Sequence, residues 1–213
     1  MQEDKRISYL KAKDNRLSKV IDAVGELNSK QYNQSTDSFF FLVREIVGQM
    51  ISANVKKTIF SRLLSLCNNE LTPNNVCKLR LEELRGIGLS QSKSKYIHNL
   101  AWLVAENKIN FDSLSQLPDE EVRKELMKIE GIGNWTSKMY LIFFLNREDV
   151  LPNEDGAFLQ AYKWLYNTKI IKKESIEKRC KKWKPYTSLG AKYLYRALDT
   201  GLTKIEINTF LNK

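Results

Sequence analysis

Two short segments of the sequence carry residue types that could act on a phosphate-bearing substrate. The first is Gly131-Ile132-Gly133, a Gly-x-Gly turn between two segments with helical spacing. Such a turn bares backbone N–H groups where a phosphate can bind. The second is the acidic segment 153–156, which follows further along the chain. A carboxylate fixed there could stabilise positive charge or activate water. Together the two segments indicate DNA that is held by its backbone and attacked at a nucleotide.

The charge of the chain supports a polyanionic partner. The sequence has 35 Lys and Arg against 25 Asp and Glu, a formal charge of +10. Such an excess favours nucleic acid through counterion release, although a solvated basic surface would give the same total. The segment 163–184 contains nine Lys and Arg and two Glu, with Trp164, Tyr166 and Trp183 among them. Basic residues mixed with aromatic rings favour nucleic acid over a membrane surface.

Several other classes of site are disfavoured by composition. Three widely spaced cysteines argue against a disulfide framework or a CxxC metal site. The single histidine rules out HExxH zinc chemistry, and no GxxxxGK[ST] loop is present. The longest apolar run, 139–145, is far shorter than the roughly 20 residues that span a bilayer. The N-terminus lacks the apolar region of a secretion signal. We therefore expect an intracellular protein, nucleoid-associated in a bacterium or archaeon and nuclear in a eukaryote.

The periodicity of apolar residues predicts an all-α fold. Glycine and proline are scarce, and most segments have helical spacing. The expected helices lie at 7–27, 39–47, 54–67, 90–107, 119–130, 136–146, 156–166 and 186–200, with short ones near 74 and 81–84. Helices joined by short hairpins can form two lobes with a cleft between them, where ligand sites concentrate. We expect one unit over 1–213, with a helix-hairpin-helix at about 120–146 and basic C-terminal helices at about 163–205.

Four blocks of the sequence resemble one protein family. Residues 129–140 (IEGIGNWTSKMY) look like the helix-hairpin-helix of the HhH-GPD DNA glycosylases, and 149–155 (DVLPNED) resemble the segment that delivers their catalytic aspartate. Residues 183–196 (WKPYTSLGAKYLYR) resemble the "W-x-P-[WY]-R-S" helix of the alkylbase, or 3-methyladenine, branch. Residues 41–52 (FLVREIVGQMIS) match its first core helix. The blocks follow the family's order, and the resemblance implies its two-lobed fold with the hairpin at the cleft.

The resemblance implies a reaction. Asp155 takes the place of the catalytic aspartate, while Glu154 and Asp149 are rival carboxylates that the family register disfavours. A fixed anion would stabilise the oxocarbenium-like sugar that forms when an N-glycosidic bond breaks. The alternative role of Asp155 is that of a plain helix N-cap. Trp135 stands where bifunctional members have a Schiff-base lysine, so the resemblance implies hydrolysis without strand cleavage.

The same resemblance implies a pocket for a flipped base. Trp135 and Tyr186 match pocket positions of the alkylbase branch, and Tyr140 and Phe158 are further candidates, with core packing as the alternative. An alkylated purine is cationic, and stacking on an aromatic face adds a cation–π attraction of about 0.5–2 kcal/mol. Such a base is already a good leaving group, which suits a site with one carboxylate and no histidine.

The hairpin is expected to bind a DNA phosphate through its backbone N–H groups. Gln49 and Met50 match a loop that wedges into the minor groove. Family members often hold a monovalent cation at the hairpin, here Na⁺ or K⁺ through the carbonyls of Met127, Ile129 and Gly131, and no other cofactor is expected. The expected DNA contacts are Gly131, Gly133, Asn134, Thr136, Lys138, Gln49 and Met50.

The sequence also departs from the family pattern. Glu130 replaces the proline of "P-G-[IV]-G" beside the expected phosphate, and Thr187 replaces the arginine of "P-[WY]-R-S". The leading hypothesis is a monofunctional glycosylase that removes 3-methyladenine and 7-methylguanine from double-stranded DNA, acting as a monomer. The alternatives are a lesion-recognising DNA-binding protein without catalysis, and a glycosylase for another base such as 8-oxoguanine or a deaminated purine.

Overall fold

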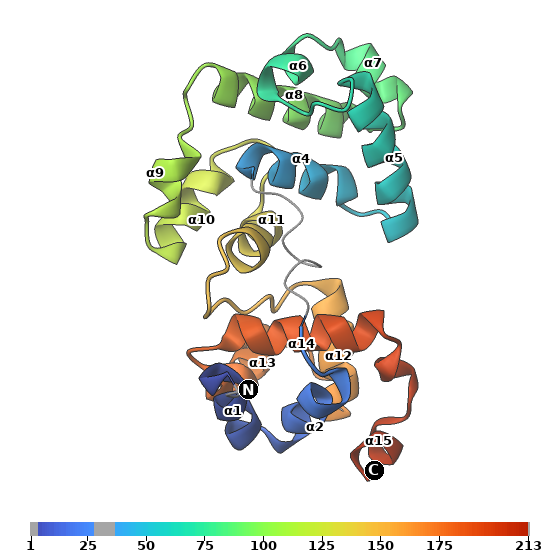
Figure 1. Ribbon diagram of the computed structural model, residues 1–213, viewed down its shortest axis with the longest axis vertical. Helices are drawn as coiled ribbons and strands as arrows, with labels where there is room; N and C mark the ends of the chain where they lie inside the picture. The colour runs from blue at the N-terminus through green and yellow to red at the C-terminus, as the bar shows by residue number, and fades with distance from the viewer. Residues whose placement is uncertain (1–3, 28–36, 213) are drawn as a thin grey trace. The chain divides into compact units, whose positions relative to one another are not determined.

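The computed structural model describes residues 4–27 and 37–212, and within these ranges it contains helices and no strand. The all-α prediction is therefore confirmed. The chain divides into two compact units. Unit 1 consists of Met1–Tyr32 and Asn146–Lys213, and unit 2 consists of Asn33–Leu145. Figure 1 labels the helices of both. None of the described helices combines the length and the apolar character needed to cross a membrane.

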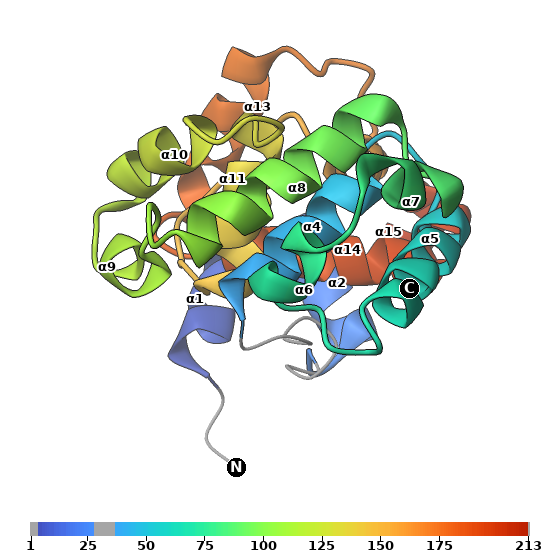
Figure 2. The ribbon, with the colours of Figure 1, turned by 90° about the horizontal axis from the view of Figure 1, so that it is seen from above.

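Unit 2 is organised around one apolar helix. Its elements are α4 (Ser38–Gly48), α5 (Ala53–Leu66), α6 (Pro73–Cys77), α7 (Leu81–Gly86), α8 (Gln91–Ala105), α9 (Phe111–Ser115), α10 (Asp119–Met127), α11 (Asn134–Met139) and the π-helix η1 (Tyr140–Phe144). Helix α4 packs against α5, α8, α11 and η1. Figure 2 shows it lying along α8. Because α4 is apolar on nearly every side, it forms the centre of the unit 2 core.

Capping side chains set most helix starts in unit 2. Asp37, Ser52, Thr72 and Ser90 each accept a hydrogen bond from a backbone N–H in the first turn that follows. The sequence predicts a cap at Thr36, Asp37 or Ser38, and Thr36 lies outside the described residues. Capping residues of this kind can be recognised in the sequence. The predicted starts of α4, α5, α6 and α8 agree with the structure within a few residues.

Two predicted helix boundaries around the Gly131-Ile132-Gly133 hairpin are wrong. Helix α10 ends at Met127 rather than at 130, because the chain turns and the N–H of Ile132 bonds to the carbonyl of Ile129 at 3.0 Å. The next helix starts at Asn134 and widens into a π-helix at Tyr140. The N–H of Leu145 accordingly bonds five residues back, to the carbonyl of Tyr140, at 2.9 Å.

In unit 1 the first and last described helices share one hydrophobic core. Its elements are α1 (Lys5–Lys13), α2 (Asn15–Val24), α12 (Gly156–Tyr166), α13 (Lys173–Cys180), the 3₁₀ turn η2 (Lys181–Trp183), α14 (Thr187–Asp199), the 3₁₀ turn η3 (Leu202–Lys204) and α15 (Ile207–Leu211). Helices α2, α12 and α14 pack against one another. The helical region predicted over 7–27 consists of two helices, because Asp14 leaves helical geometry between them. Helix α15 also follows the helix predicted to be last.

Asp14 is the polar centre of unit 1. Its side chain is 2% exposed. One carboxylate oxygen accepts the N–H groups of Arg16 and Leu17, which caps α2. The other accepts the Tyr166 hydroxyl at 2.5 Å and the Trp183 indole N–H at 2.9 Å, and pairs with Lys182 Nζ at 2.9 Å. Burial alone would raise the pKa of Asp14, but the hydrogen bonds from Tyr166, Trp183 and Lys182 hold it below its ordinary value.

In unit 2 the Gly131-Ile132-Gly133 hairpin is fixed from two sides. Gly131 has φ +88°, a conformation that side chains disfavour, and a Cβ there would lie 2.4 Å from the Tyr96 ring. The Gln49 side chain donates from Nε2 to the Gly131 carbonyl at 2.9 Å and to Thr136 Oγ1 at 3.2 Å. The turn is therefore specified by a glycine, a packed aromatic ring and an amide from α4's C-terminal end.

We predict that replacing Asp14 weakens the fold in a pH-dependent way. Asp14→Ala should lower the free energy of unfolding at pH 7 by about 3 kcal/mol, because it removes a cap and the partner of buried groups. Asp14→Asn, which keeps the cap, should cost less. Since the folded carboxyl has a pKa below its ordinary 3.8, its contribution is complete at neutral pH and is lost as the pH falls below that value.

Urea unfolding at pH 7 and near pH 3 measures this contribution. The control is Asp22→Ala, which removes a carboxylate that is 58% exposed and pairs with Lys11. That loss should stay below about 1 kcal/mol. Equal losses for the two alanine variants at pH 7 would show that the Asp14 network does not stabilise unit 1.

We predict that the two glycines of the hairpin respond differently to a methyl group. Gly131→Ala should cost about 3 kcal/mol, because it combines a disfavoured φ with overlap on Tyr96. Gly133→Ala should cost about 1 kcal/mol or less, because its Cβ would enter open space at negative φ. Thermal or urea unfolding of the two variants makes the comparison, and a similar cost for both would contradict this account of the turn.

Candidate active site

Asp155 begins the helix that the sequence assigns to it. It is the N-cap of α12, and its Oδ1 accepts the N–H of Phe158 at 2.8 Å. Its own N–H donates to the Pro152 carbonyl at 3.0 Å, which forms a tight turn ahead of the helix. The residue is 8% exposed. The carboxylate is thus held in one orientation at the positive end of a three-turn helix, where a negative charge is stabilised.

The segment before Asp155 is anchored to the start of α14. The Ser188 hydroxyl binds the N–H of Val150 at 2.9 Å and its carbonyl at 3.3 Å. The backbone N–H of Ser188 donates to the Glu148 carbonyl at 2.9 Å. Further along, Asn153 Nδ2 donates to Glu177 Oε1 at 2.8 Å. These bonds fix the approach of the chain to Asp155 from both α13 and α14.

Asp155 differs from the two rival carboxylates, Asp149 and Glu154, in its burial and its position. Asp149 accepts the Thr187 hydroxyl at 2.5 Å and pairs with Lys184 Nζ at 3.1 Å. Asp149 therefore helps to attach the segment before Asp155 to the start of α14. Thr187, which departs from the family pattern, donates one of these bonds. Glu154 is exposed to solvent. Of the three carboxylates, Asp155 alone is both buried and placed at a helix N-terminus.

The aromatic candidates fall into two groups. Tyr186 and Trp135 are partly exposed, and the Tyr186 ring meets Tyr9 edge-on at 5.4 Å. Tyr140 and Phe158 are 0% exposed. Both rings pack on aromatic side chains of their own unit, and their assignment to a base pocket stays a prediction.

Tyr140 has the contacts of a core residue. Its ring stacks on Phe144 with centroids 4.8 Å apart and meets Phe41 edge-on. Its hydroxyl bonds to Ser38 Oγ at 2.9 Å. Burial raises the pKa of Tyr140 to about 12, so the phenol stays protonated at neutral pH. Phe158 similarly packs on Tyr162 inside the unit 1 core.

The side chains after the hairpin are mostly engaged with protein. The Asn134 amide oxygen accepts a hydrogen bond from Arg123. Thr136 is 1% exposed and accepts the bond from Gln49, and Lys138 is 8% exposed. Phosphate contacts from the side chains of Thr136 and Lys138 stay a prediction. The backbone remains the better candidate, since the first N–H groups of a helix have no acceptor within the helix itself.

Met50 follows Gln49, whose side chain and backbone carbonyl both form hydrogen bonds with other parts of unit 2. It is exposed over its full surface, with φ +57°. The preceding residue, Gln49, gives its side chain to the hairpin, and its carbonyl accepts Lys93 Nζ at 2.6 Å. Burial lowers the pKa of Lys93. The arrangement leaves an apolar side chain in solvent on a fixed base, as an intercalating wedge requires. The supporting bonds of Gln49 have no signal in the sequence, because their partners are far along the chain.

Two of the carbonyls expected to hold a cation already accept hydrogen bonds. Ile129 accepts from the N–H of Ile132, and Gly131 accepts from Gln49. A carbonyl has two lone pairs, so each retains capacity for an ion. The described residues contain no group of three or more His, Cys, Asp and Glu side chains suited to a metal. Glu130, beside the glycines, is exposed.

The chain is similar to known DNA-3-methyladenine glycosylases. DNA-3-methyladenine glycosylase 1 of Schizosaccharomyces pombe is 28% identical over 192 residues, or 88% of this chain and 84% of that protein. A solved S. pombe 3-methyladenine DNA glycosylase in complex with abasic DNA matches 92% of this chain and 97% of its own at TM-score 0.82 and 27% identity. The DNA-3-methyladenine glycosidase of Bacillus halodurans matches 99% and 97% at TM-score 0.79 and 27% identity.

The family comparison covers the hairpin, the Asp155 segment and the beginning of the basic C-terminal region. The model described as "HhH-GPD superfamily base excision DNA repair protein" matches residues 43–185, well over half of the chain. This confirms the resemblance carried by the sequence motifs. The chain belongs to the HhH-GPD superfamily of base excision DNA repair proteins.

Proposed function

We propose that this protein is a monofunctional DNA glycosylase that removes alkylated purines, such as 3-methyladenine and 7-methylguanine, from double-stranded DNA. The observation that carries the proposal is Asp155, a buried carboxylate oriented by the α12 N-terminus on a segment anchored to α14. The names of the S. pombe and B. halodurans relatives support the substrate class.

Asp155 would act on the sugar rather than on the base. As the N-glycosidic bond of an alkylated purine breaks, the deoxyribose gains oxocarbenium character, and a fixed anion nearby stabilises that charge. The carboxylate could also orient or deprotonate the attacking water. The departing base is cationic before the reaction and needs no proton from the protein. Its positive charge would favour stacking on the partly exposed rings of Trp135 and Tyr186.

Trp135 supports hydrolysis without strand cleavage. An indole has no amine that could form a Schiff base with the sugar, and Lys138, three residues on, is 8% exposed. A water molecule would therefore take the place of the lysine nucleophile, and the product would be an abasic site in an unbroken strand.

The hairpin would hold the DNA backbone of the lesion strand. Backbone N–H groups around Gly131 and Gly133 would bind a phosphate, and Met50 would fill the space that the flipped base leaves. A Na⁺ or K⁺ ion on the carbonyls of Met127, Ile129 and Gly131 would add positive charge there. The exposed Glu130 would place a negative charge beside that phosphate. Because Glu130 departs from the family pattern, a DNA-binding protein without catalysis is the second candidate. We propose that the protein acts as a monomer.

We predict that Asp155→Asn abolishes excision and spares folding. Asparagine retains an oxygen for the Phe158 N–H, so the cap and the free energy of unfolding should change little. The rate of base release should fall about 100-fold or more, because the stabilising charge is lost. Single-turnover assays on a duplex containing 7-methylguanine measure the rate, and anisotropy measures DNA binding. Glu154→Gln is the control and should keep nearly full activity. Near wild-type base release by a DNA-binding Asp155→Asn variant would reject Asp155 as the catalyst.

We also predict the form of the product. Separate duplexes carry an alkylated purine, 8-oxoguanine or a deaminated purine, and abasic sites are measured with and without alkali. Strand breaks should appear only after alkali, and with alkylated purines in preference to the other bases. Breaks without alkali would contradict the monofunctional reaction. Preference for another lesion would change the substrate, and duplex binding without any release would favour the non-catalytic alternative.

A further inference from the structure

Unit 1 contains a basic pocket that the proposed excision chemistry does not use. It has a volume of about 590 Å³, and every residue that lines it belongs to unit 1. The side chains that matter are Lys13, Asp14, Arg16, Tyr166, Arg179 and Lys182, which come from the region where α1 meets α2, from the end of α12, and from α13 and η2. The volume falls within the range of about 300–1,000 Å³ typical of small-ligand sites.

The pocket has more positive charge than its own carboxylate can balance. Asp14 pairs with Lys182 at 2.9 Å and takes its other bonds from Tyr166, Trp183 and the α2 backbone. Within residues 4–27 and 37–212, no carboxylate forms an ion pair with Lys13, Arg16 or Arg179. Those three cations therefore line the pocket without an ion-pair partner of their own, since Asp14 pairs with Lys182.

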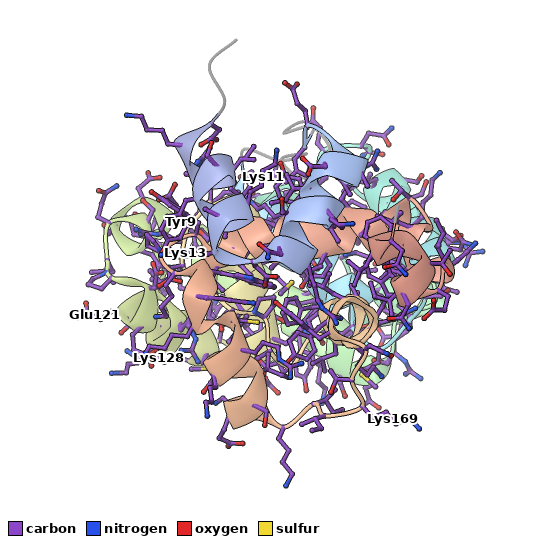
Figure 3. The ribbon with its side chains drawn as sticks, turned by 90° about the horizontal axis from the view of Figure 1, so that it is seen from below. Tyr9, Lys11, Lys13, Glu121, Lys128 and Lys169 are labelled. Carbon is purple, nitrogen blue, oxygen red and sulfur yellow. The ribbon has the colours of Figure 1, made fainter. Side chains whose placement is uncertain are left out.

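Aromatic rings and a carbonyl hold these cations in place without neutralising them. The Arg179 guanidinium lies over the Tyr166 ring at 4.8 Å, and Lys13 Nζ lies over Tyr9 at 5.5 Å. Arg16 donates to the Leu165 carbonyl at 2.8 Å. Figure 3 shows Tyr9 and Lys13 along α1 on this face of unit 1. Cations that are fixed before a ligand arrives lose less conformational entropy when they bind it.

We propose that this pocket binds a phosphate group. A phosphate has several oxygens that can accept the paired N–H groups of a guanidinium together with an ammonium group, which matches two arginines and a lysine converging from separate elements. The phosphate has two potential sources. One is the backbone of a nucleic acid, an option that rests on the proposed DNA-directed function. The other is a free phosphorylated small molecule, which the volume of the pocket can accommodate.

The test compares two doubly substituted full-length chains with the same change in charge. The pocket variant is Lys13→Gln with Arg179→Gln. The control is Lys169→Gln with Lys178→Gln, two exposed residues of unit 1 that do not line the pocket, and Lys178 lies on the same helix as Arg179. Thermal unfolding confirms that both variants remain folded. Lys182 and Asp14 are left unchanged, because they belong to the buried network.

Three probes separate the sources of phosphate: inorganic phosphate, deoxyadenosine 5′-monophosphate and an undamaged duplex. Calorimetry should give about tenfold or more weaker binding of a free-phosphate probe to the pocket variant, the factor expected when a charge-assisted hydrogen bond is removed. If the source is nucleic acid, the slope of log affinity against log salt concentration should fall in magnitude by about 0.9 for each DNA phosphate that the variant no longer neutralises. The control should match the unmodified chain in both measurements.

The proposal is overturned if the pocket variant and the control bind all three probes equally. A change confined to the duplex identifies a nucleic-acid phosphate, and a change confined to the free probes identifies a small phosphorylated ligand. The base-excision panel stays a separate readout. If the chain binds phosphate in the pocket but releases no base, the proposed function is refuted and the phosphate site is not.

Discussion

The buried carboxylate of Asp14 is the interaction on which the organisation of unit 1 depends. It joins the start of α2, the end of α12 and the turn η2 through one side chain. Helix α12 is consequently fixed at both ends by an aspartate, since Asp155 caps its N-terminus and Tyr166, its last residue, reaches Asp14. The position of the proposed catalyst thus depends on a network at the opposite end of the same helix.

The features that the sequence predicts well are local. Asp155 as the cap of 156–166 and the Gly131 turn can both be recognised because the residues that decide them are neighbours along the chain. Asp14 shows the limit of this reasoning. Its side-chain partners Tyr166 and Trp183 lie 152 and 169 residues away, so no neighbouring residue indicates that Asp14 would be the buried polar centre of unit 1.

At the candidate site, too, the sequence identifies local motifs but not the contacts between residues that are far apart along the chain. Motif matching finds Asp155, but it cannot tell which aromatic rings have an open face, and Tyr140 and Phe158 prove to be core residues. Motif matching also marks Thr187 only as a departure from the family pattern, whereas the structure shows its hydroxyl donating a hydrogen bond to Asp149. A departure from a family motif can therefore be an exchange of one partner for another, and sequence alone does not reveal the new partner.

The backbone at Met50 has a consequence for the evolution of this loop. A methionine with φ +57° occupies a conformation that costs about 1–2 kcal/mol relative to the right-handed region, and its exposed side chain gains no packing in return. Glycine or asparagine would relieve that strain. A strained backbone at an exposed residue is typical of positions where function outweighs local stability. A β-branched wedge would be excluded there by the backbone, whatever its fit to DNA.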